Sequence, residues 1–163
     1  MAALLDRLLP PVASNAYHGP RVAVIGLALL TALMLFRSGV HLFAPDGGMQ
    51  SIATMIVFEG DPDPDRVIHS LASLWGLEQL IVASLQALVL LRYRNLVPLM
   101  LLLLGVEWLG RLGIGLFLQP LGPEFFARTP PGVRGILPML VVIAGLLALS
   151  LRPPRKPSTE PER

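Results

Sequence analysis

The sequence contains no cysteine and few charged residues. The absence of cysteine excludes disulfide bonds, thiolate catalysis and metal sites ligated by cysteine. Charged residues make up only 15% of the chain, whereas soluble domains contain about 25%. There is no Ser-His-Asp arrangement, phosphate-binding loop, haem motif or dinucleotide fingerprint, and the basic residues form no nucleic-acid-binding patch. We therefore expect no cofactor, no metal and no nucleic-acid partner.

Long apolar runs are the main feature that the sequence does contain. Apolar residues make up 53% of its 163 residues and gather in four runs. A helix needs roughly 20 apolar residues to cross a hydrocarbon core about 30 Å thick. Each run satisfies that length, and the predicted spans cover residues 21–43, 67–91, 96–118 and 135–151. The predicted fold is all-α, an integral membrane four-helix bundle, and the expected partner is the lipid bilayer.

The two ends of the chain differ from the spans in composition. Residues 1–20 contain Leu4, Leu5, Leu8 and Leu9 at helical spacing, and Pro10 stops the pattern. This spacing predicts a short cytoplasmic or interfacial helix before the transmembrane domain, residues 21–151. Residues 152–163 are polar and rich in proline. That composition predicts a disordered cytoplasmic tail.

The first long loop contains a shorter apolar segment. Residues 49–58, MQSIATMIVF, are too few to cross a bilayer. We expect them to form a short interfacial helix in the first outer loop, with Asp65 capping the second span. Pro98 and Pro138 are expected in the first turns of the third and fourth spans, where a missing N–H costs little.

The basic residues predict how the chain lies in the membrane. Lys and Arg are enriched in short loops on the cytoplasmic side. We consider an orientation in a bacterial inner membrane with both termini in the cytoplasm. The cytoplasmic side then holds Arg7, Arg21, Arg92, Arg94, Arg152, Arg155, Lys156 and Arg163. The same orientation leaves in the outer loops Arg66, Arg128 and Arg134. We therefore expect both termini in the cytoplasm.

Ionisable residues inside the spans are the candidate functional residues. A charge in the bilayer core is expensive and is typical of a pairing or a functional site. Glu107 and Arg111 are four residues apart and share one helical face. Glu78 is expected near the midplane, with Arg111 or Arg37 as its partner. We therefore predict a buried polar cluster that contains Glu78, Glu107, Arg111, Arg37 and Gln79.

Two interpretations of this cluster remain open. Two acids and two arginines would be neutral together, which favours an interhelical ion-pair cluster that holds the bundle together. Alternatively, Glu78 or Glu107 takes up a proton or a ligand. Trp75 and Trp108 lie within one turn of the two glutamates, and we expect them to line either kind of site.

Several short strings resemble those of small uncharacterised bacterial membrane proteins. They are the Gly- and His-bearing end of the first span, the loop PDGGMQSIATMI and the string RYRNLVPLML. Over roughly residues 22–118, the size and layout are similar to those of the DoxX-like group. The resemblance implies a four-helix bundle in a bacterial membrane and brings no activity with it.

The sequence favours a non-enzymatic role over catalysis. The leading hypothesis is a structural or accessory membrane subunit, which binds other membrane subunits or copies of itself. The alternative is a proton-coupled small-molecule transporter that uses Glu78 and Glu107. A membrane-embedded enzyme acting on lipid or quinone is the third hypothesis, because the sequence contains no catalytic set.

Overall fold

A computed structural model describes residues 2–152, and this part of the chain is all-helical. Four helices are long and apolar enough to cross a membrane, so the protein is a multi-pass membrane protein and the predicted four-helix bundle is confirmed. The helices are α1 (Ala2–Leu8), α2 (Arg21–Phe43), α3 (Asp65–Arg92), α4 (Val97–Gly113) and α5 (Pro131–Ser150). Short helical turns accompany them at η1 (Arg94–Leu96), η2 (Ile114–Leu118) and η3 (Pro123–Phe125).

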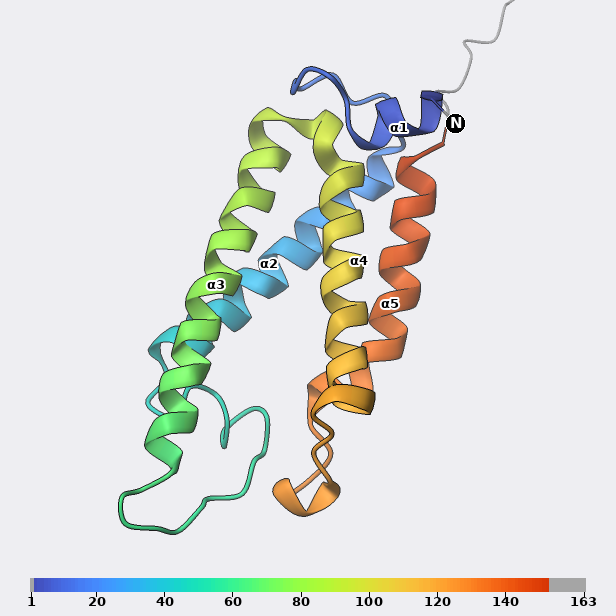
Figure 1. Ribbon diagram of the computed structural model, residues 1–163. Helices are drawn as coiled ribbons and strands as arrows, with labels where there is room; N and C mark the ends of the chain where they lie inside the picture. Colours follow the sequence, from blue (N-terminus) through green and yellow to red (C-terminus); the bar gives the residue numbers. More distant parts are fainter. Residues whose placement is uncertain (1, 153–163) are drawn as a thin grey trace, which may run out of the picture.

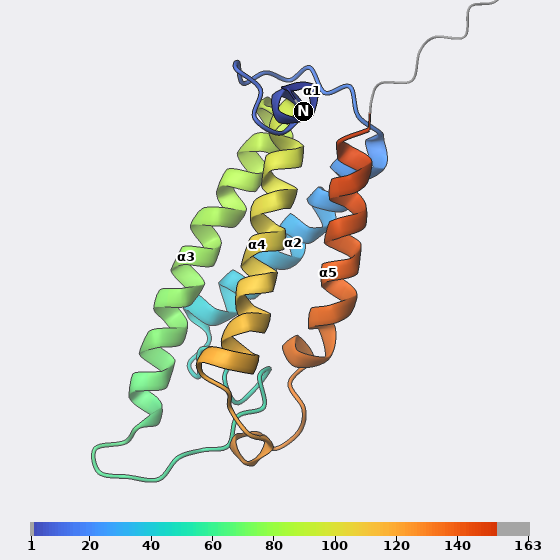
Figure 2. The ribbon, with the colours of Figure 1, turned by 45° about the vertical axis from the view of Figure 1, so that its right-hand side comes forward.

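The bundle has two different ends (Figure 1). At the end here called the terminal end, α1 lies beside the tight α3–α4 turn and the last turn of α5. The opposite end, the loop end, carries the two long loops 44–64 and 119–130. Figure 2 shows that α3 diverges from α4 toward the loop end, as it does in Figure 1.

Helices α2 and α3 form the most extensive contact of the bundle. They run antiparallel, and one register relates the residues that face each other. Thr31 is hydrogen-bonded to Gln86, and Met34 packs in one buried cluster with Ala83. At Gly76 the helices are so close that an added Cβ would lie 2.7 Å from the backbone nitrogen of Leu42. Only glycine allows this approach.

Helices α4 and α5 form the second antiparallel pair, and α2 touches both of them. Leu104 and Ile143 are buried together between this pair and α2. By contrast, α3 makes very few contacts with α4. Helix α3 is therefore an edge helix that packs on α2 along one face and leaves its other face bare.

The amino-terminal segment is tied to the terminal end of the bundle. Arg7 of α1 donates a hydrogen bond of 2.9 Å from Nη1 to the Leu151 carbonyl. Asn95, in the α3–α4 turn, donates from its amide nitrogen to the Val12 carbonyl and accepts from the Ser14 N–H. The predicted short amino-terminal helix is thus present. Apart from Arg152, the predicted disordered tail lies outside the described residues.

The prediction of a helix at residues 49–58 is wrong. This segment forms turns and then extended chain, with one antiparallel bridge between Met55 and Phe126 of the second loop. The Ile56 N–H donates to the Phe125 carbonyl at 3.1 Å, and the Ala127 N–H donates to the Thr54 carbonyl at 2.8 Å. Because the backbone groups find partners in the other loop, the segment gains nothing from a helix, which at this length is marginal.

Two details of the helix ends also differ from expectation. Pro98 does lie in the first turn of α4, but α5 begins at Pro131, so Pro138 lies inside the helix. The helical hydrogen bonds of α5 begin at Pro131, four residues before the apolar run from which the span was predicted. Asp65 makes no capping bond, and its own N–H donates to Asp63 Oδ1 at 2.9 Å. Asp63 therefore satisfies the donor at this helix end.

Candidate functional site

A polar cluster inside the spans surrounds Trp75 of α3. The guanidinium carbon of Arg111, from α4, lies 4.8 Å from the centre of the Trp75 ring, and that of Arg37, from α2, lies at 5.8 Å. The His41 ring stacks at 4.6 Å from the Trp75 ring. Cations within about 6 Å of an indole face are attracted by its electron density. Three helices therefore meet at one aromatic side chain, which the sequence predicted as a wall of the site.

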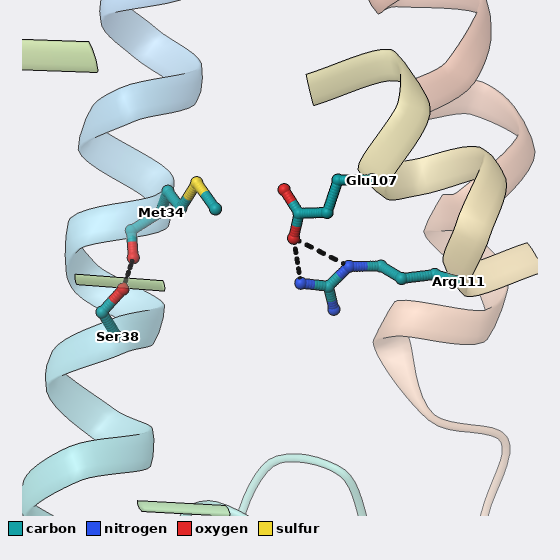
Figure 3. A network of polar contacts seen from close by, with 4 residues as sticks. All are labelled: Met34, Ser38, Glu107 and Arg111. Carbon is teal, nitrogen blue, oxygen red and sulfur yellow. Dashed lines mark hydrogen bonds and ion pairs between the residues drawn. The ribbon is translucent and has the colours of Figure 1, made fainter. Parts of the chain in front are cut away.

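Glu107 and Arg111 form the predicted ion pair along α4. Arg111 donates from Nε to Glu107 Oε1 at 3.0 Å and also donates from Nη2 to the same oxygen. Figure 3 shows both side chains projecting from α4 toward α2. Their exposed fractions are 21% for Arg111 and 29% for Glu107. The pair is thus largely withdrawn from the protein surface.

The cluster carries one positive charge more than it can pair. Within residues 2–152, Arg37 makes no hydrogen bond and no ion pair. Its contact is with the Trp75 ring, which leaves its five N–H donors free. Two guanidiniums and one carboxylate give a net charge of +1 (2 − 1). The prediction of a neutral cluster, with two acids and two arginines, is therefore wrong.

Glu78 is the residue that the prediction misplaced. It is exposed, and it has no hydrogen bond or ion pair within the described part of the chain. Gly76 and Gln79 define the face of α3 that packs on α2. At about 100° per residue, Glu78 points well away from that face. The expected pairing of Glu78 with Arg111 or Arg37 is wrong because the rotation of α3 directs its carboxylate outward.

Gln79 is buried, but in the α2–α3 interface and not beside the ion pair. Its side chain is only 3% exposed, and neither amide atom has a hydrogen-bond partner among the described residues. The register of the two helices places it level with Ser38. The Ser38 hydroxyl donates to the Met34 carbonyl at 2.6 Å (Figure 3). The Gln79 amide is thus left unsatisfied in a tight interface, which is unfavourable.

Thr31 and Gln86 form a buried polar pair between α2 and α3, and Thr31 was not predicted from the sequence. Thr31 donates to the Leu27 carbonyl at 2.8 Å and to Gln86 Oε1 at 3.1 Å, and both side chains are buried. The buried positions of α2 follow one another at spacings of four and three residues: Leu27, Thr31, Met34, Ser38 and His41. That spacing marks one helical face and could have indicated the interface.

Two histidines near the loop end, His41 and His69, are held separately. His41 Nδ1 lies 2.7 Å from the Gly47 carbonyl, so this nitrogen carries the proton. His69 Nε2 lies 2.9 Å from Gln50 Oε1 in the first loop. Among residues 2–152, no group of three His, Asp or Glu side chains is arranged to hold a metal. The histidines anchor the first loop to the ends of α2 and α3.

A separate cavity of about 360 Å³ lies at the terminal end. The segment before α2 covers it, and Tyr17, Asn95 and Ser150 are among the residues that line it. The Tyr17 hydroxyl is buried without a partner in the described residues. Burial raises the pKa of this phenol to about 12, so it stays protonated at neutral pH.

The chain matches no family model, no curated protein and no solved structure. Its class therefore rests on the fold and the cluster themselves. They define a multi-pass α-helical membrane protein with a cationic, aromatic centre between α2, α3 and α4.

Proposed function

We propose that this protein is a non-enzymatic subunit of a membrane complex, joined to its partner through the bare face of α3. The observation that carries the proposal is the position of Glu78. This carboxylate is exposed near the middle of the 28-residue α3. At 1.5 Å per residue it lies about 20 Å from either helix end, which is at the depth of the bilayer midplane.

The surroundings of Glu78 are apolar. Exposed neighbours on the same helix include Leu74, Ile81 and Leu85. A charged side chain facing hydrocarbon at the helix centre costs about 2.5–3.5 kcal/mol on insertion scales. A partner helix that offers a cation or an amide donor would remove this cost and supply an interhelical hydrogen bond.

Charge favours a different protein over a second copy of this chain. A symmetric contact between two α3 helices would bring two Glu78 carboxylates together, and like charges repel in low dielectric. The proposed partner therefore carries Lys, Arg, His, Asn or Gln at mid-membrane depth. A transporter that passes a proton between Glu78 and Glu107 is less well supported, because Glu107 is paired with Arg111 and Glu78 lies on another surface.

The proposal includes a location and an orientation. We place the protein in a bacterial cytoplasmic membrane with the terminal end inside, since Arg92 and Arg94 flank the tight turn at that end. A DoxX-like layout belongs to the same proposal and rests on the sequence strings alone.

Site-specific photo-cross-linking in cells tests the interface. A cross-linker at Ile81, one turn from Glu78, should form one discrete adduct, while a cross-linker at Val141 of α5, which is also exposed, should not. The adduct should persist in Glu78→Gln and disappear in Glu78→Leu. Glu78→Lys should also abolish it, and an acidic residue at the partner's mid-membrane position should restore it. An adduct with a second copy, or one indifferent to Glu78→Leu, would contradict the proposal.

A further inference from the structure

We propose that the cavity at the terminal end of the bundle binds the phosphate of an anionic phospholipid, a phosphodiester with one negative charge such as that of phosphatidylglycerol. The cavity has a volume of about 360 Å³ and lies between the amino-terminal segment and the ends of α4 and α5. It is separate from the Glu78 surface of α3 and from the cluster around Trp75. Its shape, its charge, its level in the membrane and the apolar surface beside it all favour such a ligand.

Hydrogen bonds and packing hold the wall of the cavity in place. Arg7 is bonded to a backbone carbonyl at the end of α5, and Asn95 is bonded to the backbone of residues 12 and 14. The Tyr17 ring packs against a buried cluster of α2, α3 and α4, and it lies so close to Gly19 that an added Cβ there would overlap it. The cavity is therefore formed before a ligand binds. Its volume lies at the lower end of the range for small-molecule sites, about 300–1,000 Å³, which suits a polar head group whose acyl chains stay in the bilayer.

The lining of the cavity carries more positive than negative charge. Arg7 and Arg152 line it, and the other ionisable residues of the lining are Asp6 and His18. With His18 neutral the sum is +1 (2 − 1). Within the described part of the chain neither arginine forms an ion pair, and the Arg152 guanidinium makes no hydrogen bond. Arginine is suited to phosphate because its planar guanidinium can donate two parallel hydrogen bonds to it. One bound monoanion would therefore make the cavity neutral and occupy donors that are otherwise unused.

The cavity lies at the level of the lipid phosphates. Helix α5 has 20 residues, and at 1.5 Å per residue it is about 30 Å long, which is the thickness of the hydrocarbon core. Its last residue, Ser150, and the nearby Arg152 both line the cavity. These residues therefore lie at the edge of the hydrocarbon, where the head-group region begins.

The apolar surface beside the cavity favours a lipid over a soluble phosphate ester. Helix α1, which contributes Arg7 to the lining, and the residue that follows it expose three apolar side chains. They are Leu4, Leu5 and Leu9, each more than half exposed. A short helix at the membrane surface buries such leucines among acyl chains. A phospholipid held by its phosphate can cover them with its own chains, which a soluble phosphate ester cannot do.

Titration of the purified full-length protein with dilauroyl phosphatidylglycerol in a neutral detergent tests the site. The lipid should raise the melting temperature of the wild-type protein to a plateau, because a ligand that binds the folded state stabilises it. Arg152→Gln should weaken the apparent affinity about tenfold, as expected for the loss of a charge-assisted pair. It should leave the melting temperature without lipid unchanged. Arg92→Gln is the matched control, because Arg92 is an exposed arginine at the same end that does not line the cavity, and this variant should bind like wild type. Ala16→Trp, which fills the cavity and keeps its charge, should weaken binding as well.

Two further ligands identify the source of the phosphate. Dilauroyl phosphatidylcholine has the same chains and no net charge, and glycerol phosphate has the charged group without the chains, so both should stabilise the protein less than phosphatidylglycerol does. Equal stabilisation by the two lipids would overturn the selection of an anion. Equal weakening by Arg92→Gln and Arg152→Gln would show attraction to the surface as a whole and overturn the cavity as the site. Stabilisation by glycerol phosphate that depends on Arg152 and equals that by phosphatidylglycerol would overturn the lipid and leave a soluble phosphate ester as the ligand.

Discussion

The guanidinium of Arg111 lies 4.8 Å from the centre of the Trp75 ring. This contact connects α4 to α3 at a level where the two helices diverge (Figures 1 and 2). Arg37 approaches the same ring from α2. At this level a cation–aromatic centre therefore links three helices, while the most extensive helix packing is between α2 and α3 and between α4 and α5.

Removal of the Trp75 indole should loosen this centre. Trp75→Leu loses two cation–π contacts and should lower the free energy of unfolding in detergent by about 1–3 kcal/mol. Trp75→Phe, which keeps a smaller ring, should lose less. Trp108→Leu is the matched control, because Trp108 has only one such contact, at 5.9 Å from Arg111. A larger loss for Trp108→Leu than for Trp75→Leu would refute the central role of Trp75.

The two members of the ion pair should differ in their effect on stability. Glu107→Gln leaves two unneutralised guanidiniums at one indole and should cost roughly 2–3 kcal/mol, somewhat less than the loss of one partner of a fully buried pair. Arg111→Gln should cost less, because Arg37 remains to balance Glu107. Adding Arg37→Gln to Glu107→Gln should recover part of the loss. Melting temperatures of the wild type, the three single variants and the double variant measure this, and additive losses without recovery would rule out charge balance as the cause.

The two buried glutamines of α3 should respond in opposite directions. Gln79→Leu removes an amide without a partner and should raise the free energy of unfolding by about 1 kcal/mol. Gln86→Leu removes the hydrogen bond to Thr31 and should lower it by about 1 kcal/mol. Thermal unfolding of both variants in one detergent provides the comparison. A drop for Gln79→Leu equal to that for Gln86→Leu would mean that the Gln79 amide is bonded in the native protein.

The first loop should respond to acid through Asp46. Burial tends to raise the pKa of this carboxyl, but hydrogen bonds from the Ser51 and Gly48 N–H groups outweigh it and lower the pKa below 3.8. The ionised form therefore stabilises the folded loop above pH 3.8, and this contribution is lost as the pH falls through the lower folded-state pKa.

Amide hydrogen exchange in this loop, followed from neutral pH down to about pH 2.5, would show the effect. Protection at Ser51 should fall below pH 3.8 in the wild-type protein. In Asp46→Ala it should be low at every pH, while Asp61→Ala, which changes an exposed carboxylate, should behave like wild type. Protection that persists in Asp46→Ala would show that other contacts hold the loop.

Reporter fusions would establish the orientation. A fusion at Arg94, in the tight turn, should report the cytoplasm, and a fusion at Asp61, in the first loop, should report the outer side. Arg94 is the first residue of the third span and Asp61 lies in the first loop, so neither insertion interrupts a helix core. Reversal of the two signals would overturn the orientation and leave the fold unchanged.

Local sequence was sufficient to predict the four spans and the Glu107–Arg111 pair. A bilayer requires a fixed length of apolar helix, so composition alone locates α2, α3, α4 and α5. The pair follows from a separation of four residues within one helix. Both predictions depend only on local sequence, and the structure agrees with them.

Tertiary packing decided the features that depend on helix rotation and on distant partners. The apolar spans have hydrophobic residues on every side, so hydropathy does not reveal which face turns inward. Close packing at Gly76 rotates α3 so that Gln79 is buried and Glu78 is exposed, which leaves Arg37 without its expected acid. Likewise, residues 54–58 are extended because their backbone bonds to the second loop, some 70 residues further along the chain. Sequence determined which segments enter the membrane, whereas contacts between helices and loops determined which charges meet there.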